Sequence, residues 1–143
     1  MFNIKLITIS LILFIFSISV YGGIGLTKEQ CEKEYGKPVQ KDESNATYKY
    51  YSYNKDGFDI EVEITRGICN DVCFNTEKSR KDYITEEEIK KIILKNCKGK
   101  LTKISENKLS TGLLVTRYRS GTFLIKVGPR YVSIVSNYFS SKK

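Results

Sequence analysis

The spacing of hydrophobic residues changes several times along the chain, and each spacing predicts a different kind of element. Residues 58–64 alternate strictly between apolar and acidic side chains, which is typical of a strand with one buried and one solvent-exposed face. Residues 89–97 carry apolar side chains at helical spacing, with lysines between them. The pattern therefore predicts both strands and an amphipathic helix.

Two helices have clear starting signals. Thr27 with Gln30, and Thr85 with Glu88, each match a capping box. In this motif the first side chain accepts from the backbone N–H of the second residue, and the second side chain accepts from the backbone N–H of the first. A Gly-x-Pro sequence beginning at Gly36 ends the first helix after about two turns. The second helix has acids in its first turn and lysine in its last, which suits the helix dipole.

The remaining apolar runs predict strands separated by short turns. Strands are expected at residues 47–53, 58–64, 68–74, 101–104 (weak), 113–119, 122–127 and 131–139. Turn signals occur at Asp56-Gly57, Arg66-Gly67, Ser120-Gly121 and Gly128-Pro129. In the third strand, Ile68, Val72 and Phe74 are expected on the apolar side. Residues 41–45 are polar and predict a loop.

These elements predict an α+β fold with two short helices packed on an antiparallel sheet. The chain reads as a helix plus a three-stranded meander, then a helix plus another meander, which indicates a quasi-repeat of one architecture. Each meander has one apolar face, and the helices are the available cover. The other face of the sheet is therefore expected in water.

The first 22 residues have the order of a secretory signal peptide: a short basic start, an apolar stretch and small residues at the end. Cleavage after Gly22 would leave residues 23–143 as a single exported domain, secreted or periplasmic. The alternative is an uncleaved N-terminal membrane anchor. Spanning needs roughly 20 apolar residues, and Gly22-Gly23 interrupts the run before that length, so cleavage is favoured.

Charge is distributed unevenly along the chain, whose net charge is +8. Residues 23–97 hold 13 basic and 15 acidic residues, whereas residues 98–143 hold 10 basic residues and one acid, Glu106. The cationic final third favours an acidic protein, an anionic polymer or an anionic membrane surface as partner, and the leader argues against nucleic acid. The chain has no His, which excludes His-dependent nucleophiles and His-ligated metals. No cofactor is expected.

The cysteines, Cys31, Cys69, Cys73 and Cys97, predict two structural disulfides in an exported protein. Cys69 and Cys73 would be about 13 Å apart in an extended strand, too far for a bond without a bulge. Each is therefore expected to tie the sheet to a helix. Both Cys31–Cys69 with Cys73–Cys97 and the crossed pairing stay open. The spacing does not favour a metal site, and no Cys-x-x-Cys is present for redox catalysis.

A run from Gly25 to Pro38, Gly-Leu-Thr-x-x-Gln-Cys-x-x-x-Tyr-Gly-x-Pro, precedes the aromatic strand that begins at Tyr48. It resembles the opening of the SmpA/OmlA-type outer-membrane assembly lipoproteins. It is also similar to the helix-plus-meander modules of the beta-lactamase-inhibitor-protein type. The resemblance covers residues 25–74, and the doubled layout of the inhibitor type would extend it to the C-terminus. It implies a small exported, protein-binding scaffold. No lipid-accepting Cys follows the leader, so lipid anchoring is not implied.

Two groups of side chains are candidates for a binding surface. They are the tyrosines Tyr48, Tyr50, Tyr51 and Tyr53, and the cations Arg117, Arg119, Lys126 and Arg130. Tyrosine is enriched at interfaces because it combines a large apolar area with a polar tip. Alternation places Tyr48 and Tyr50 on one face and Tyr51 and Tyr53 on the other, so one pair is expected to be exposed. The simpler interpretations are core packing for the tyrosines and a charge-protected sheet edge for the cations.

The predicted function is a small exported protein-binding module, inhibitor-like or an accessory factor in envelope assembly, and not an enzyme. The alternative is a cationic binder of an anionic envelope polymer or lipid surface through residues 98–143. The sequence Asn45-Ala46-Thr47 also matches an N-glycosylation sequon, which matters only in a eukaryotic host.

A third interpretation is a small hydrolase that uses the carboxylates of Asp59, Glu61 and Glu63. These three acids are more simply a solvated strand face. In that case, Arg117 or Arg119 are expected to pair with them if their strands are neighbours in the sheet.

Overall fold

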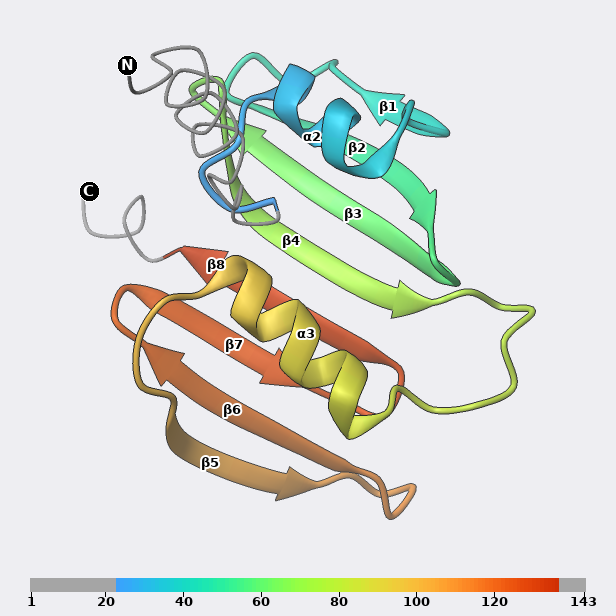
Figure 1. Ribbon diagram of the computed structural model, residues 1–143, viewed down its shortest axis with the longest axis vertical. Coiled ribbons are helices and arrows are strands. Elements are labelled where there is room, and N and C mark those ends of the chain that lie inside the picture. Colours follow the sequence, from blue (N-terminus) through green and yellow to red (C-terminus); the bar gives the residue numbers. More distant parts are fainter. Residues whose placement is uncertain (1–22, 137–143) are drawn as a thin grey trace, which may run out of the picture.

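The computed structural model describes residues 23–136, which form an eight-stranded antiparallel sheet with two helices against it (Figure 1). In chain order the elements are α2 (Lys28–Tyr35), β1 (Gln40–Asp42), β2 (Tyr48–Lys55), β3 (Phe58–Thr65), β4 (Ile68–Thr76), α3 (Glu86–Asn96), β5 (Thr102–Lys108), β6 (Leu114–Ser120), β7 (Phe123–Val127) and β8 (Tyr131–Ser136). The α+β prediction is confirmed, although the sheet is the larger part of the fold. The predicted leader, and the end of the last predicted strand, lie outside the described residues.

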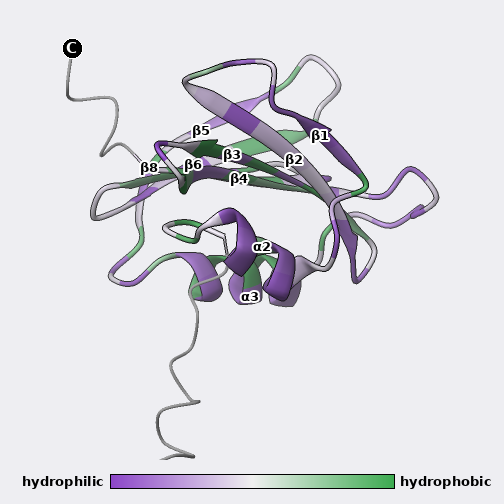
Figure 2. Cartoon of the chain, turned by 90° about the horizontal axis from the view of Figure 1, so that it is seen from above, coloured by the Kyte–Doolittle hydropathy of each residue, from purple (hydrophilic) through white to green (hydrophobic). Residues whose placement is uncertain are grey.

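The strand order across the sheet is β1-β2-β3-β4-β8-β7-β6-β5. Each helix is followed by a four-stranded meander, and the last strands of the two meanders, β4 and β8, pair at the centre. Both helices lie on the same side of the sheet, with α2 over the first meander and α3 over the second (Figures 1 and 2). Within residues 23–136, neither helix is long and apolar enough to cross a membrane.

The local signals for helices and hairpins are confirmed. The Thr27 and Thr85 side chains accept from the backbone N–H of the third helical residue, and their own backbone N–H groups donate to the side chain of that residue, which completes the two capping boxes. At the first hairpin, Asp56 and Gly57 have φ of 53° and 79°. These positive values are what a two-residue type I′ turn requires. Arg66 and Gly67, at the next hairpin, have φ of 54° and 81°.

Three strand predictions need correction. The first meander has four strands, because β1 lies where a loop was expected, and it pairs Gln40 with Ser52 and Asp42 with Tyr50. All three residues of β1 are exposed, so this edge strand carries no hydrophobic alternation to reveal it. The weak strand at 101–104 is in fact β5, Thr102–Lys108, an edge strand of mostly exposed residues.

The third correction concerns β4, where a bulge changes which side chains face the core. Glu63 pairs with Asp71 but Ile64 pairs with Cys69, so Asn70 is an extra residue. A bulge shifts the alternation by one residue. Cys69 therefore joins Val72 in the core, and Ile68, which was expected there, is 39% exposed.

The core lies between the helices and the sheet, and aromatic rings join the two layers. The Tyr35 ring on α2 packs against Tyr53 of β2 and Phe74 of β4, with ring centroids 5.6 and 6.2 Å apart. From α3, Ile92 and Ile93 are buried in the same cluster. Burying large apolar side chains is worth about 2 kcal/mol each, so this shared cluster holds both helices on the sheet.

Candidate functional site

The side of the sheet away from the helices is here named the open face, because no helix of the described residues covers it (Figure 2). Alternation along the strands decides which side chains reach it. They include Tyr48 and Tyr50 of β2, Asp59, Glu61 and Glu63 of β3, Asp71 and Cys73 of β4, Ser133 and Val135 of β8, Leu124 and Lys126 of β7, and Arg117 and Arg119 of β6.

The open face has an acidic half and a cationic half. One cross-strand row runs from Glu61 through Cys73, Ser133 and Lys126 to Arg117. The row begins at an acid and ends at two cations, with two uncharged side chains between them. In this row the two charge signs are therefore kept apart by Cys73 of β4 and Ser133 of β8.

A second row repeats this order. It runs from Glu63 through Asp71, Val135 and Leu124 to Arg119. Here the side chains between the acids and the cation are apolar, and Val135 and Leu124 are half-buried. In this row the open face thus has an apolar strip of two side chains, Val135 and Leu124, with opposite charges on its two sides.

Glu63 organises the acidic half through hydrogen bonds. The Tyr50 hydroxyl donates to its carboxylate at 2.7 Å, and the Asn70 amide and Thr65 hydroxyl donate at 3.1 and 3.3 Å. The bond to the carboxylate raises the pKa of Tyr50 to about 12. The Tyr48 ring meets the Tyr50 ring edge-on, with centroids 5.4 Å apart. Tyr50 is therefore held in place while 44% of its surface stays exposed.

Asp71 is the residue of the acidic half that the sequence did not single out. It lies directly across from Glu63, and burial together with repulsion from Glu63 raises its pKa to about 6. With Tyr50, Glu61 and Cys73, these two acids line a hollow of about 300 Å³. The two-residue turn predicts that Asn70 faces Glu63, so only the bulge places Asp71 there, and no sequence signal could have found it.

The cationic half is formed by Arg117 and Arg119 of β6 and Lys126 of β7. Arg117 and Arg119 are exposed, and neither forms an ion pair with a residue in the described part of the chain. The expected pairing of these arginines with Glu61 and Glu63 does not occur. Strands β3 and β6 are separated by β4, β8 and β7, a distance of about 19 Å at ordinary strand spacing.

Tyr51 and Tyr53 face the helices instead of the open face. They are 2% and 0% exposed, and the Tyr51 hydroxyl donates to the carboxylate of Glu43. Of the four candidate tyrosines, the core contains these two, and Tyr48 and Tyr50 remain available at the surface.

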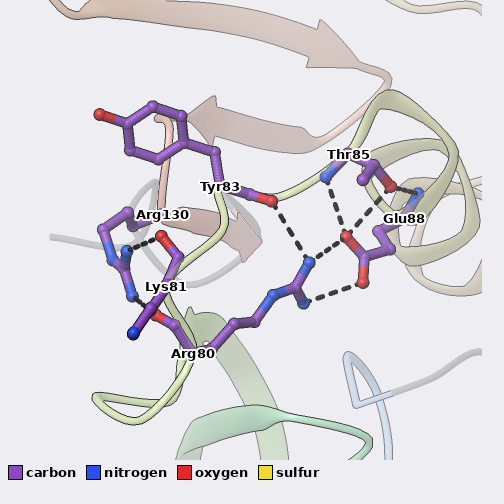
Figure 3. A network of polar contacts seen from close by, with 6 residues as sticks. All are labelled: Arg80, Lys81, Tyr83, Thr85, Glu88 and Arg130. Carbon is purple, nitrogen blue, oxygen red and sulfur yellow. Dashed lines mark hydrogen bonds and ion pairs between the residues drawn. The ribbon is translucent and has the colours of Figure 1, made fainter.

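Arg130, the fourth candidate cation, lies immediately before β8 and contacts the loop before α3 (Figure 3). Its guanidinium donates to the carbonyl oxygen of Arg80 at 2.5 Å, and to those of Glu77 and Lys81 at 3.4 Å. In the same loop Arg80 forms a two-pronged ion pair with Glu88, at 2.9 and 2.7 Å. Arg130 therefore positions a loop and is left out of the open face.

The four cysteines are free thiols in the structure. Cys31 on α2 and Cys69 on β4 are both buried on the helix side of the sheet. Cys97, at the end of α3, is on that side as well. Cys73 lies between the core residues Val72 and Phe74 and so reaches the open face. The expectation that Cys73 ties the sheet to a helix is not met, because the sheet itself lies between Cys73 and both helices.

A second hollow, of about 360 Å³, lies between the two helices over the apolar floor formed by Phe58, Ile60 and Phe74. Its rim charges are largely paired, since Glu34 contacts both Lys55 and Lys95. Across residues 23–136, no three His, Cys, Asp or Glu side chains are grouped so that they could hold a metal ion.

Comparisons with known proteins add little to this geometry. No family model matches the chain, and no curated protein matches it. A cysteine-rich secretory protein from Staphylococcus aureus has a similar arrangement, with a TM-score of 0.49 and 12% sequence identity. The match covers 81% of this chain and 44% of that one, so this chain spans less than half of that protein's length.

Proposed function

We propose that this protein is a small exported protein-binding module, and that its partner docks on the open face with acidic groups against Arg117 and Arg119. The observation that carries the proposal is the central strip of Val135 and Leu124, with exposed, unpaired arginines on one side of it. Export rests on the predicted leader.

The dimensions of the open face support a protein partner. Eight strands at ordinary spacing are about 34 Å wide, and six residues of strand are about 20 Å long, which gives roughly 700 Å². A standard protein–protein interface buries about 800 Å² on each partner. Such interfaces place apolar and aromatic side chains centrally and charges around them, which is the arrangement of Leu124 and Val135 between the two charged halves.

The rigidity of the open face supports the same proposal. Its side chains project from hydrogen-bonded strands, and Tyr50 is held by Glu63. A side chain that is already fixed loses little conformational entropy when a partner binds. Tyr and Arg are also the residue types that most often carry binding energy at interfaces.

Position-specific photo-crosslinking tests the proposal. A photoreactive amino acid is introduced at Leu124, at the centre of the open face, or at Leu94, which is 74% exposed on the outer side of α3. Each variant is incubated with the envelope and medium of the producing cell. A protein adduct that forms from position 124 and not from position 94 is expected. The same adduct from both positions, or from position 94 alone, would contradict the proposal.

Charge reversal then measures the contribution of the cationic half to binding of the captured protein. Arg117→Glu with Arg119→Glu is expected to weaken that binding at least 30-fold, since a central arginine contributes about 2 kcal/mol or more. The matched control is Lys33→Glu with Lys90→Glu, the same charge change on the exposed sides of the two helices. The control should bind as the wild-type protein does.

A second candidate function is binding to an anionic polymer or lipid surface, which is favoured by the exposed lysines and arginines along β5 and β6. Its probes are heparin and vesicles of phosphatidylglycerol. Polyanion binding should fall steeply between 50 and 500 mM salt, roughly as the screening length shrinks, and should decrease for every lysine reversal, including the helix control. A protein interface centred on Leu124 should persist in salt.

A further inference from the structure

The structure brings two of the four cysteines together from elements far apart in the sequence. Cys31 is 0% exposed on α2, and Cys69 is 1% exposed on β4. The Cys69 thiol is within hydrogen-bonding reach of the Cys31 sulfur and lowers the pKa of Cys31. The same contact, together with burial, raises the pKa of Cys69.

Backbone hydrogen bonds explain why these two residues meet. The N–H of Gly25 donates to the carbonyl oxygen of Cys69, and the N–H of Cys69 donates to the carbonyl oxygen of Leu26, both at 2.8 Å. The segment that leads into α2 is therefore attached to Cys69 itself. Thr27 then caps the helix, and Cys31 follows one turn later, on the side of the helix that faces the sheet.

The bulge at Asn70 is the second requirement. In a regular strand, Cys69 would share a face with Asp71 and Cys73, both of which reach the open face. The extra residue puts the two cysteines on opposite faces, with Cys69 on the helix side opposite Ile64 and Cys73 on the open face. The bulge therefore decides which of the two neighbouring cysteines can reach Cys31.

We propose that Cys31 and Cys69 form a disulfide that links α2 to β4 in an oxidising compartment, while Cys73 and Cys97 remain thiols. The inference does not depend on the proposed binding function. It replaces the two bridges expected from the cysteine count with one, because Cys73 is on the opposite side of the sheet from every other cysteine.

The oxidation is a thiol–disulfide exchange with a small disulfide such as oxidised glutathione. The Cys31 thiolate attacks one glutathione sulfur, and the S–S bond breaks to release one glutathione thiolate. Cys69 gives up its proton, and its sulfur attacks the Cys31 sulfur of the mixed disulfide, which releases the second glutathione. Two protein thiols are oxidised and one glutathione disulfide is reduced. Because both sulfurs are buried, the exchange occurs before α2 has packed on the sheet or when it opens locally.

Thiol counting and mapping on residues 23–143 test the assignment. After refolding with oxidised glutathione, two thiols should react in denaturant, against four after reduction. Cys69 and Cys73 fall on one tryptic peptide, so cleavage before Asp71 with endoproteinase Asp-N is needed to separate them. The expected linked pair contains Cys31 and Cys69. Four thiols after oxidation, or a bridge that includes Cys73 or Cys97, would overturn the proposal.

Stability gives a second readout. Closing the loop between Cys31 and Cys69 should raise the equilibrium constant for folding by a factor of roughly 30 to 1,000. The oxidised protein should therefore melt about 10 °C above the reduced protein. Cys73→Ser with Cys97→Ser should keep this difference, and Cys31→Ala should abolish it. If Cys31→Ala does not fold, the Cys73→Ser, Cys97→Ser variant alone decides, because an equal melting temperature in its two redox states would contradict the link.

Discussion

The ring of Tyr131 packs directly against the backbone of Gly128. A Cβ at Gly128 would lie 2.4 Å from Cε1 of that ring and 2.8 Å from Cδ1. The N–H of Gly128 donates to the carbonyl oxygen of Tyr131 at 2.9 Å, which closes the β7–β8 turn. Gly128 does not have a positive φ, so glycine is required at this position for the close approach of the ring.

Gly128→Ala should therefore destabilise the protein by about 2 kcal/mol, the ordinary cost of overpacking, as measured by urea unfolding. Gly121→Ala is the matched control. Gly121 has φ of +57° and nothing near its Cβ position, so that variant should cost only the backbone strain of about 1 kcal/mol. Removing the ring with Tyr131→Ala should recover part of the Gly128→Ala cost. If the double variant is simply additive, the ring is not the cause.

Asp71 should make the protein less stable as the pH rises from about 4 to 6. The Asp71 pKa is about 6 in the folded protein, raised by burial and by repulsion from Glu63, with Glu61 adding to the effect and Lys126 opposing it. In the unfolded chain it is about 3.9. Over that interval the folded state keeps a proton that the unfolded state has lost. The contribution of Asp71 is therefore full below pH 4, declines up to pH 6 and then levels off.

Asp71→Asn should remove this slope and raise the free energy of unfolding at pH 7.5 by about 1–2 kcal/mol. Urea unfolding at pH 4.5 and 7.5 measures the effect. Asp56→Asn, at the exposed β2–β3 turn, is the control and should leave the pH dependence as it is in the wild-type protein. Equal pH dependence in Asp71→Asn and the wild-type protein would show that Asp71 ionises without cost to the fold.

Glu88 should act in the opposite direction and at lower pH. The Arg80 guanidinium and the Thr85 N–H hold its pKa at about 2 in the folded protein, against about 4.3 when unfolded. Its contribution is therefore present above pH 4 and is lost as the pH falls toward 2. The Arg80 and Glu88 side chains are partly exposed, at 20% and 29%. Glu88→Gln should therefore lower the free energy of unfolding by only about 1 kcal/mol at pH 7.

The neighbouring Glu87→Gln provides the control for this prediction, because Glu87 is exposed and has no partner among residues 23–136 in any ion pair of the structure. Thermal unfolding from pH 2 to 7 compares the two variants. The fall in melting temperature between pH 7 and pH 2 should be smaller for Glu88→Gln than for the wild-type protein, and it should be unchanged for Glu87→Gln. Identical acid unfolding in both variants would show that the Arg80–Glu88 contact does not cause the loss of stability at low pH.

Arg117→Glu with Arg119→Glu should leave the fold intact. Exposed strand charges change stability by about 0.5 kcal/mol or less, and the nearest acids of the open face are several strands away. The melting temperature should therefore stay within about 3 °C of wild type. A large fall would mean that these arginines stabilise the sheet, and any loss of binding would then follow from unfolding.

The sequence by itself determined the elements whose signals are local. The capping boxes at Thr27 and Thr85 begin the helices because each satisfies backbone donors within one turn. The Asp56-Gly57 and Arg66-Gly67 pairs mark two hairpins, because a two-residue type I′ turn needs positive φ at both of its central positions and glycine adopts it readily. Strict alternation from Phe58 to Ile64 places the acids of β3 in water. These features depend on neighbours within a few residues, and all of them could be predicted.

Only the tertiary structure decided what depends on pairing between distant segments. The bulge at Asn70 puts Cys69 and Cys73 on opposite faces of the sheet and places Asp71 opposite Glu63, although nothing in the residue types requires an extra residue there. The pairing of β4 with β8 separates the acids of β3 from Arg117 by three strands. Strand order and register depend on how the apolar faces of the two meanders pack against the two helices. This packing energy is not encoded in any short stretch of the chain.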